Sequence, residues 1–144
     1  MGWDAYMAKG SWEEYCANSS YEGFVYARDL LDDPTIKVAI DDAMKELLSF
    51  PDVTNCCLLG AELCGGRWQF EQIVGELAWA RENKDGQLYW PHHKVQQVYN
   101  RIQHNIERDR ARFSYSECNS SDYEQIRLFL KVCEENDLGI LFTW

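Results

Sequence analysis

Apolar residues recur every three or four positions in several stretches of the chain, and this spacing predicts amphipathic helices. The clearest case is residues 34–49, where the apolar residues form one stripe and Asp41, Asp42 and Lys45 lie away from it. Three further stretches share this spacing and are predicted to be helical: 21–32, 92–111 and 122–136. Each of these helices needs other elements to cover its apolar face.

Short motifs mark where several of the helices begin and end. Asp33 precedes Pro34, and this pair is typical of a helix start, because aspartate caps the first turn and proline suits its first position. The capping-box spacing Ser-x-x-Glu begins at Ser11, Ser19 and Ser121. Gly139 is predicted to end helix 122–136.

Strand character is weaker and concentrates near the end of the chain. Residues 140–144 form the clearest strand, and residues 53–59 and 112–116 have some strand character. Strand 112–116, helix 122–136 and the last strand are predicted to form a crossover unit. We therefore predict an α+β fold, mainly α, in a single compact domain over 1–144, with about five to six helices and a small sheet that includes the C-terminal strand.

A fifth predicted helix, residues 67–83, has an unusual second face. Phe70, Ile73 and Val74 belong to an ordinary apolar stripe, whereas Trp68 and Trp79 lie together on the opposite side. One interpretation is a central helix buried on two sides. The other is a tryptophan-lined contact surface, because tryptophan is enriched where binding energy concentrates in interfaces.

The negative charge of the chain is concentrated in its first half. Residues 1–66 contain twelve acidic and four basic residues, and residues 67–144 contain twelve and ten, within an overall net charge of −10. Such a one-sided field favours a positively charged partner. The predicted partner-binding residues combine acids of the first half with the two tryptophans: Asp29, Asp32, Asp33, Asp41, Asp42, Trp68 and Trp79.

No catalytic or metal-binding motif is apparent in the sequence. There is no Gly-x-Ser-x-Gly elbow, no phosphate-binding glycine loop and no Cys-x-x-Cys pair. His92 and His93 are neighbours in a first helical turn and point about 100° apart, so they do not converge on one metal. We predict no metal site and no cofactor, and the six cysteines are expected to be reduced and mostly buried.

Charge and hydropathy also argue against nucleic acid and membrane as partners. The basic stretch 94–112 is interrupted by Glu107 and Asp109, and the net charge opposes approach to a phosphate backbone. No apolar run approaches the ~20 residues of a membrane span, and the first residues do not resemble a signal peptide. We therefore expect a cytoplasmic protein.

Small acidic chains that are rich in aromatic residues and lack catalytic motifs are typical of inhibitor and immunity-type proteins. We predict a non-enzymatic protein-binding domain that neutralises a basic partner, such as a toxin or a nucleic-acid enzyme. One alternative is a small enzyme or ligand-binding protein that uses His92 or His93 with nearby acids or cysteines. The other is a subunit of a larger assembly, a homodimer included, that packs through the tryptophan helix.

Overall fold

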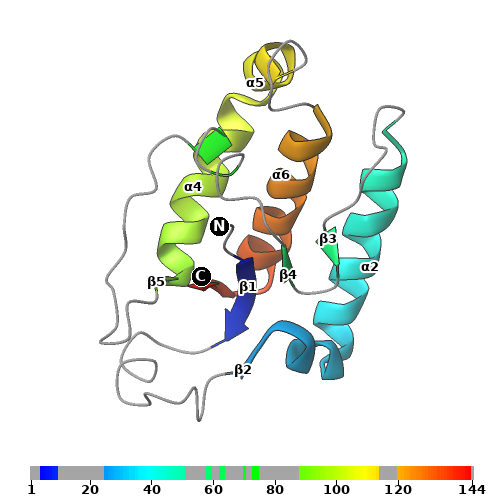
Figure 1. Ribbon diagram of the computed structural model, residues 1–144, viewed down its shortest axis with the longest axis vertical. Helices are drawn as coiled ribbons and strands as arrows, with labels where there is room; N and C mark the ends of the chain where they lie inside the picture. The colour runs from blue at the N-terminus through cyan, green and yellow to red at the C-terminus, as the bar shows by residue number, and fades with distance from the viewer. Residues whose placement is uncertain are drawn as a thin grey trace.

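The computed structural model describes residues 4–9, 25–50, 58–59, 62–63, 70, 73–74, 88–113 and 120–143. Figure 1 shows their arrangement. In chain order the elements are β1 (Asp4–Lys9), β2 (Val25–Tyr26), the 3-10 helix η1 (Ala27–Asp32), α2 (Pro34–Leu48), β3 (Leu58–Leu59), β4 (Glu62–Leu63), β5 (Leu88–Trp90), α4 (His92–His104), α5 (Ile106–Phe113), α6 (Ser120–Glu135) and β6 (Gly139–Thr143).

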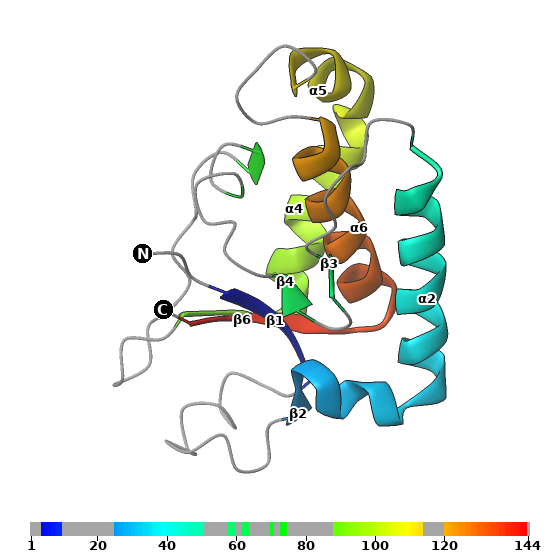
Figure 2. The same ribbon diagram turned by 45° about the vertical axis from the view of Figure 1, so that its right-hand side comes forward.

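The helices form a layer beside a small sheet, with α6 in the middle. Figures 1 and 2 both show α6 between α4 and α2, and α5 at the end of this layer that is farther from β1 and β6. Helix α6 packs against α4, α2 and α5. This arrangement confirms the predicted α+β, mainly helical fold with a small sheet that includes the C-terminal strand. The single domain over 1–144 stays a prediction.

The sheet pairs β1, near the beginning of the chain, with β6, near its end, and every pairing among the described strands is antiparallel. Its order is β3-β4-β1-β6-β5, and β2 also pairs with β1. In the centre, Ala5 lies opposite Phe142 and Met7 opposite Ile140, while Tyr89 of β5 lies opposite Leu141. The predicted crossover unit is therefore wrong: residues 112–113 belong to α5, and both neighbours of β6 run antiparallel to it.

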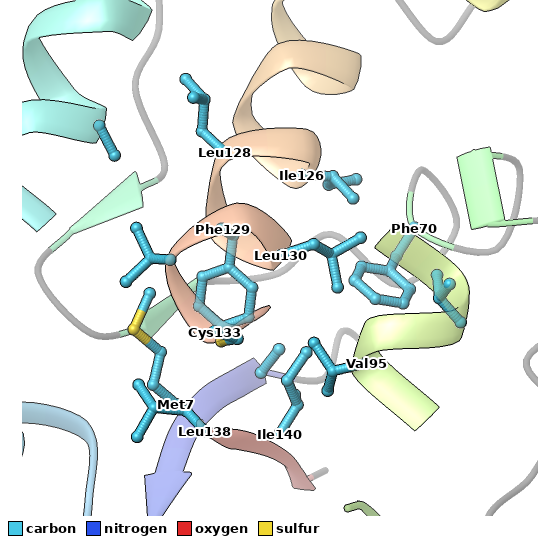
Figure 3. Packing of buried hydrophobic residues seen from close by; sticks show 14 of the residues in the cluster. Met7, Phe70, Val95, Ile126, Leu128, Phe129, Leu130, Cys133, Leu138 and Ile140 are labelled. Atoms are coloured by element: carbon cyan, nitrogen blue, oxygen red, sulfur yellow. The ribbon is translucent and has the colours of Figure 1, made fainter. Parts of the chain in front are cut away.

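Helix α6 is buried on every side over its central turns. All residues from 123 to 130 are buried, among them the polar Glu124, Gln125 and Arg127. Figure 3 shows Phe129 and Leu130 of this helix among residues from α4 and both central strands. Beside them Phe70, Trp90 and Phe142 form an aromatic cluster whose ring centroids lie 5.2–5.7 Å apart. This core holds the helices and the sheet in one arrangement.

Two helix predictions need correction, one because of pairing with a distant strand and the other because of a local side-chain hydrogen bond. Residues 25–26 form β2 through pairing with β1, and within the described part of this stretch the helical residues are 27–32, as the 3-10 helix η1. The predicted helix 92–111 is divided at Asn105, whose side-chain amide donates to the carbonyl of Arg101 at 3.0 Å. Such a bond from an asparagine side chain competes with continued helix.

The end of α6 also differs from the prediction. Asp137, with φ 56°, adopts the left-handed conformation that ends many helices, and the Leu138 amide donates to the Cys133 carbonyl at 3.0 Å. Gly139 is instead the first residue of β6, where an added Cβ would lie 2.5 Å from the carbonyl oxygen of Trp90. At the other end of the helix, Ser121 lies within α6 rather than before it, and the Glu124 carboxylate binds arginines instead of closing a capping box.

Candidate functional site

Asp33, one of the predicted partner-binding residues, is the N-cap of α2. Its carboxylate accepts a hydrogen bond from the backbone amide of Thr35 at 2.9 Å and so caps the helix as its sequence predicts. Asp32, directly before it at the end of η1, is exposed. A substitution of Asp33 therefore changes the start of α2 as well as the surface charge.

The structure separates Asp41 from Asp42. Both are exposed, but consecutive residues of a helix point about 100° apart. The Asp41 carboxylate pairs with Lys37 Nζ at 3.1 Å on one flank of α2, while Asp42 lines a groove on the other flank. Three other predicted site residues lie outside what the structure describes: the side chain of Asp29, and the whole of Trp68 and Trp79.

The groove runs between α2 and α6 and has a volume of about 380 Å³. Figures 1 and 2 show the two helices side by side along this stretch. Residues of both helices and Asn136, directly after α6, line it: Thr35, Val38, Ala39, Asp42, Ala43, Glu46, Lys131, Val132, Glu135 and Asn136. The sequence indicated the outward acids of α2 but gave no indication that α6 lies beside them.

The carboxylates of the groove differ in whether a positively charged side chain lies close to them. Glu46 has its two oxygens 3.7 Å from Arg127 Nη2 and 3.7 Å from Lys131 Nζ. Asp42 and Glu135 are exposed, and neither has an ion-pair partner within the described part of the chain. The negative charge of the groove is therefore in excess near Asp42 and Glu135, and it is balanced near Glu46.

An apolar surface accompanies this charge. Val38 is 58% exposed and lies on the same groove as Asp42, one helical turn earlier in α2. Ala39, Ala43 and Val132 extend the apolar lining. A desolvated apolar centre beside charged groups is the usual composition of a protein interface.

Buried charges behind the groove hold α6 to its neighbours. Glu124 accepts from Arg127 Nε at 2.7 Å and from Arg110 Nε at 2.6 Å, so one buried carboxylate serves two guanidinium groups. The hydrogen bond from Arg110 to Glu124 raises the pKa of that guanidinium. Since Arg127 also approaches Glu46, charged contacts connect α5, α6 and the groove side of α2.

The two histidines lie in different surroundings. His92 Nδ1 lies 3.0 Å from the Leu138 carbonyl and donates to it, since a carbonyl oxygen only accepts; its Nε2 is 3.6 Å from Asp137 Oδ1. His93 is exposed. Within the described ranges, no three His, Cys, Asp or Glu side chains are placed to hold a metal ion.

Cys133 is the one cysteine whose side chain the structure describes, and it belongs to α6 and points into the core. Burial raises the pKa of its thiol well above the usual range, so that the nucleophilic thiolate is strongly disfavoured. The other five cysteines fall outside the described residues: Cys16, Cys56, Cys57, Cys64 and Cys118.

None of the helices described by the structure has both the length and the apolar character that a membrane span requires. The cytoplasmic location stays a prediction. Comparisons of the chain with protein-family models, with curated proteins and with solved structures found no match.

Proposed function

We propose that the chain is a protein-binding domain that neutralises a basic partner protein, in the manner of an inhibitor or immunity protein. The observation that carries this proposal is the pair of exposed carboxylates, Asp42 and Glu135, which lie on two packed helices beside the exposed Val38. Charged groups of this kind steer a partner of opposite charge, and an apolar contact adds affinity once it is buried.

The rest of the molecule is consistent with such a role. The net charge of −10 attracts a basic partner from a distance, within the range that salt screening allows. Helix α2 is anchored through its buried residues, among them Ile36, Ile40 and Leu47. The acids of its outer face are therefore presented in a defined geometry, which lowers the entropy lost on binding.

The two alternative functions draw no support from the described residues. The His92 ring donates a hydrogen bond to the carbonyl of Leu138, shortly after α6. Histidines with a purely structural role make the same kind of bond, so this contact does not favour catalysis. The assembly hypothesis depends on Trp68 and Trp79, which lie outside the described part of the chain.

The test is affinity purification from the cells that make the protein, with the wild type, Asp42→Lys and Glu107→Lys as baits. Glu107 is an exposed acid of α5, so its reversal changes the net charge equally but away from the groove. We expect a basic protein that is captured at low salt, released as salt rises, and lost with Asp42→Lys only. Binding that is indifferent to salt, or equally weakened by both reversals, contradicts the proposal.

A further inference from the structure

The groove between α2 and α6 is long enough to accompany a helix over several turns. The two helices run in opposite directions, as Figure 1 shows, and the lining residues Thr35, Val38, Asp42 and Glu46 follow helical spacing along α2. At 1.5 Å per residue, this row is about 16 Å long, or about three helical turns. Two adjacent helices leave a channel into which a third helix packs with its ridge of side chains.

The charge in this channel is graded along its length. At one end Glu46 is compensated by Lys131 and Arg127. Further along the channel, Asp42 from α2 and Glu135 from α6 are unpaired among the described residues, and Val38 is exposed beside them. A ligand that complements this surface carries positive charge next to an apolar side chain.

We propose, as a deepening of the proposed function, that this channel binds an α-helix of the basic partner. The helix presents an apolar side chain to Val38, and lysine or arginine side chains flank it at i, i+3 or i+4, where they reach Asp42 and Glu135. An amphipathic helix in a groove is a recurrent mode of recognition, and its anchors follow this spacing. The charge excess at Asp42 and Glu135 selects against acidic helices, since like charges in contact oppose binding.

The experiment is a selection from a displayed library of stapled helices of about three to five turns, randomised on one face, against the full chain. We expect enriched sequences with lysine or arginine at i, i+3 or i+4 around an apolar residue. Chemical-shift mapping of a selected peptide should place it on α2 and α6. Spermine and an unstapled, proline-containing peptide of the same composition serve as non-helical cationic probes.

Matched variants test which side chains contribute to the affinity for the selected peptide. Asp42→Asn with Glu135→Gln removes two charges from the channel, whereas Asp41→Asn with Glu107→Gln removes two exposed charges elsewhere. We expect the first pair to raise the Kd of a selected peptide roughly tenfold and the second less than about twofold. Val38→Ser should weaken binding, and Leu48→Ser, at a 66% exposed apolar residue of α2 outside the lining, should not.

Several outcomes overturn the inference. These are enriched helices without cationic residues, chemical shifts that map away from the channel, equal effects of the two double variants, or non-helical probes that bind as tightly as the selected helix. No enrichment at all also counts against it. If the purification from cells still captures a basic partner that depends on Asp42, the proposed function stands and only the helical mode of binding fails.

Discussion

Glu124 and Arg127, three residues apart on α6, form an ion pair that is closed to solvent. Glu124 Oε2 lies 2.7 Å from Arg127 Nε, and each side chain is 4% exposed. Arg110 of α5 occupies the other oxygen, Oε1, at 2.6 Å. Because a buried charge without a partner is costly, this carboxylate fixes how α5 and α6 pack together.

Replacement of Glu124 by glutamine is expected to destabilise the protein strongly. The amide keeps the size of the side chain but removes the carboxylate 2.7 Å from the buried guanidinium of Arg127, which keeps only the more distant Glu46 at 3.7 Å. Breaking a buried ion pair in this way typically costs about 3–5 kcal/mol. Urea denaturation of Glu124→Gln measures this loss. A double variant, Glu124→Leu with Arg127→Met, should recover most of it, because both buried charges are then absent.

The exposed pair of Lys37 and Asp41 provides the control for this prediction. It is a surface ion pair with both side chains more than half exposed, so Asp41→Asn should change the free energy of unfolding by less than about 1 kcal/mol. If Glu124→Gln and Asp41→Asn lower the free energy of unfolding equally, the buried ion pair stabilises the protein no more than the exposed one, and the prediction is wrong.

Gly139→Ala is expected to disturb the junction of β5 and β6. The new Cβ would meet the hydroxyl of Tyr89 and lie 2.5 Å from the backbone carbonyl oxygen of Trp90, which cannot move without changing the strand. Overpacking of this kind costs about 1–3 kcal/mol or more. Thermal unfolding gives the change in stability, and amide exchange at Leu141 reports on the strand pairing; unchanged exchange and stability contradict the prediction.

At the end of α6, glycine should be preferred over alanine at position 137. Asp137 has φ 56°, a conformation that costs a residue with a Cβ about 1–2 kcal/mol and costs glycine little. Asp137→Gly and Asp137→Ala both remove the carboxylate beside His92, so their difference isolates the backbone. We expect the glycine variant to be more stable than the alanine variant by about 1 kcal/mol in urea denaturation. The reverse order would mean that residue 137 leaves the left-handed region in solution.

Tyr123 makes the stability depend on pH in the alkaline range. Burial, and next the negative charges of Asp109 and Glu124, raise the pKa of its phenol from 10.0 to about 12. The raised pKa means that the unfolded chain loses this proton first. The stabilising contribution is therefore complete below pH 10 and is lost as the pH rises from about 10 to about 12.

Denaturation of the wild type and Tyr123→Phe across this pH range measures the effect. Phenylalanine keeps the ring that stacks on Phe113, with centroids 5.4 Å apart, and removes a buried hydroxyl that has no hydrogen-bond partner among the described residues. The variant should lack part of the alkaline loss, and at neutral pH it should be at least as stable as the wild type. Parallel pH curves for the two proteins contradict the prediction.

Sequence patterns predicted those elements whose cause is local. Helix α2 follows from the Asp33 cap, the position of Pro34 and one apolar stripe, and its buried residues are those of that stripe. The C-terminal strand β6 follows from a short apolar run after the end of α6. Both signals lie within a few residues of the structure that they specify.

Elements that depend on distant partners were missed or misread. Strand β1 is stabilised by pairing with β6, from the opposite end of the chain, and its own sequence carries only a weak strand pattern. Residues 25–26 were predicted to be helical, yet they pair with β1. In these places pairing between distant segments outweighs the local preference of the backbone.

The candidate site shows the same division. The amino-acid sequence by itself determined that the protein is acidic and that Asp41 and Asp42 lie on the outer side of an amphipathic helix. Only the tertiary structure decided that Asp42 shares a groove with Glu135 while Asp41 pairs with Lys37. The physical reason is that helical periodicity specifies which face of a helix is outward, whereas the neighbour of that face is specified by packing of the whole core around α6.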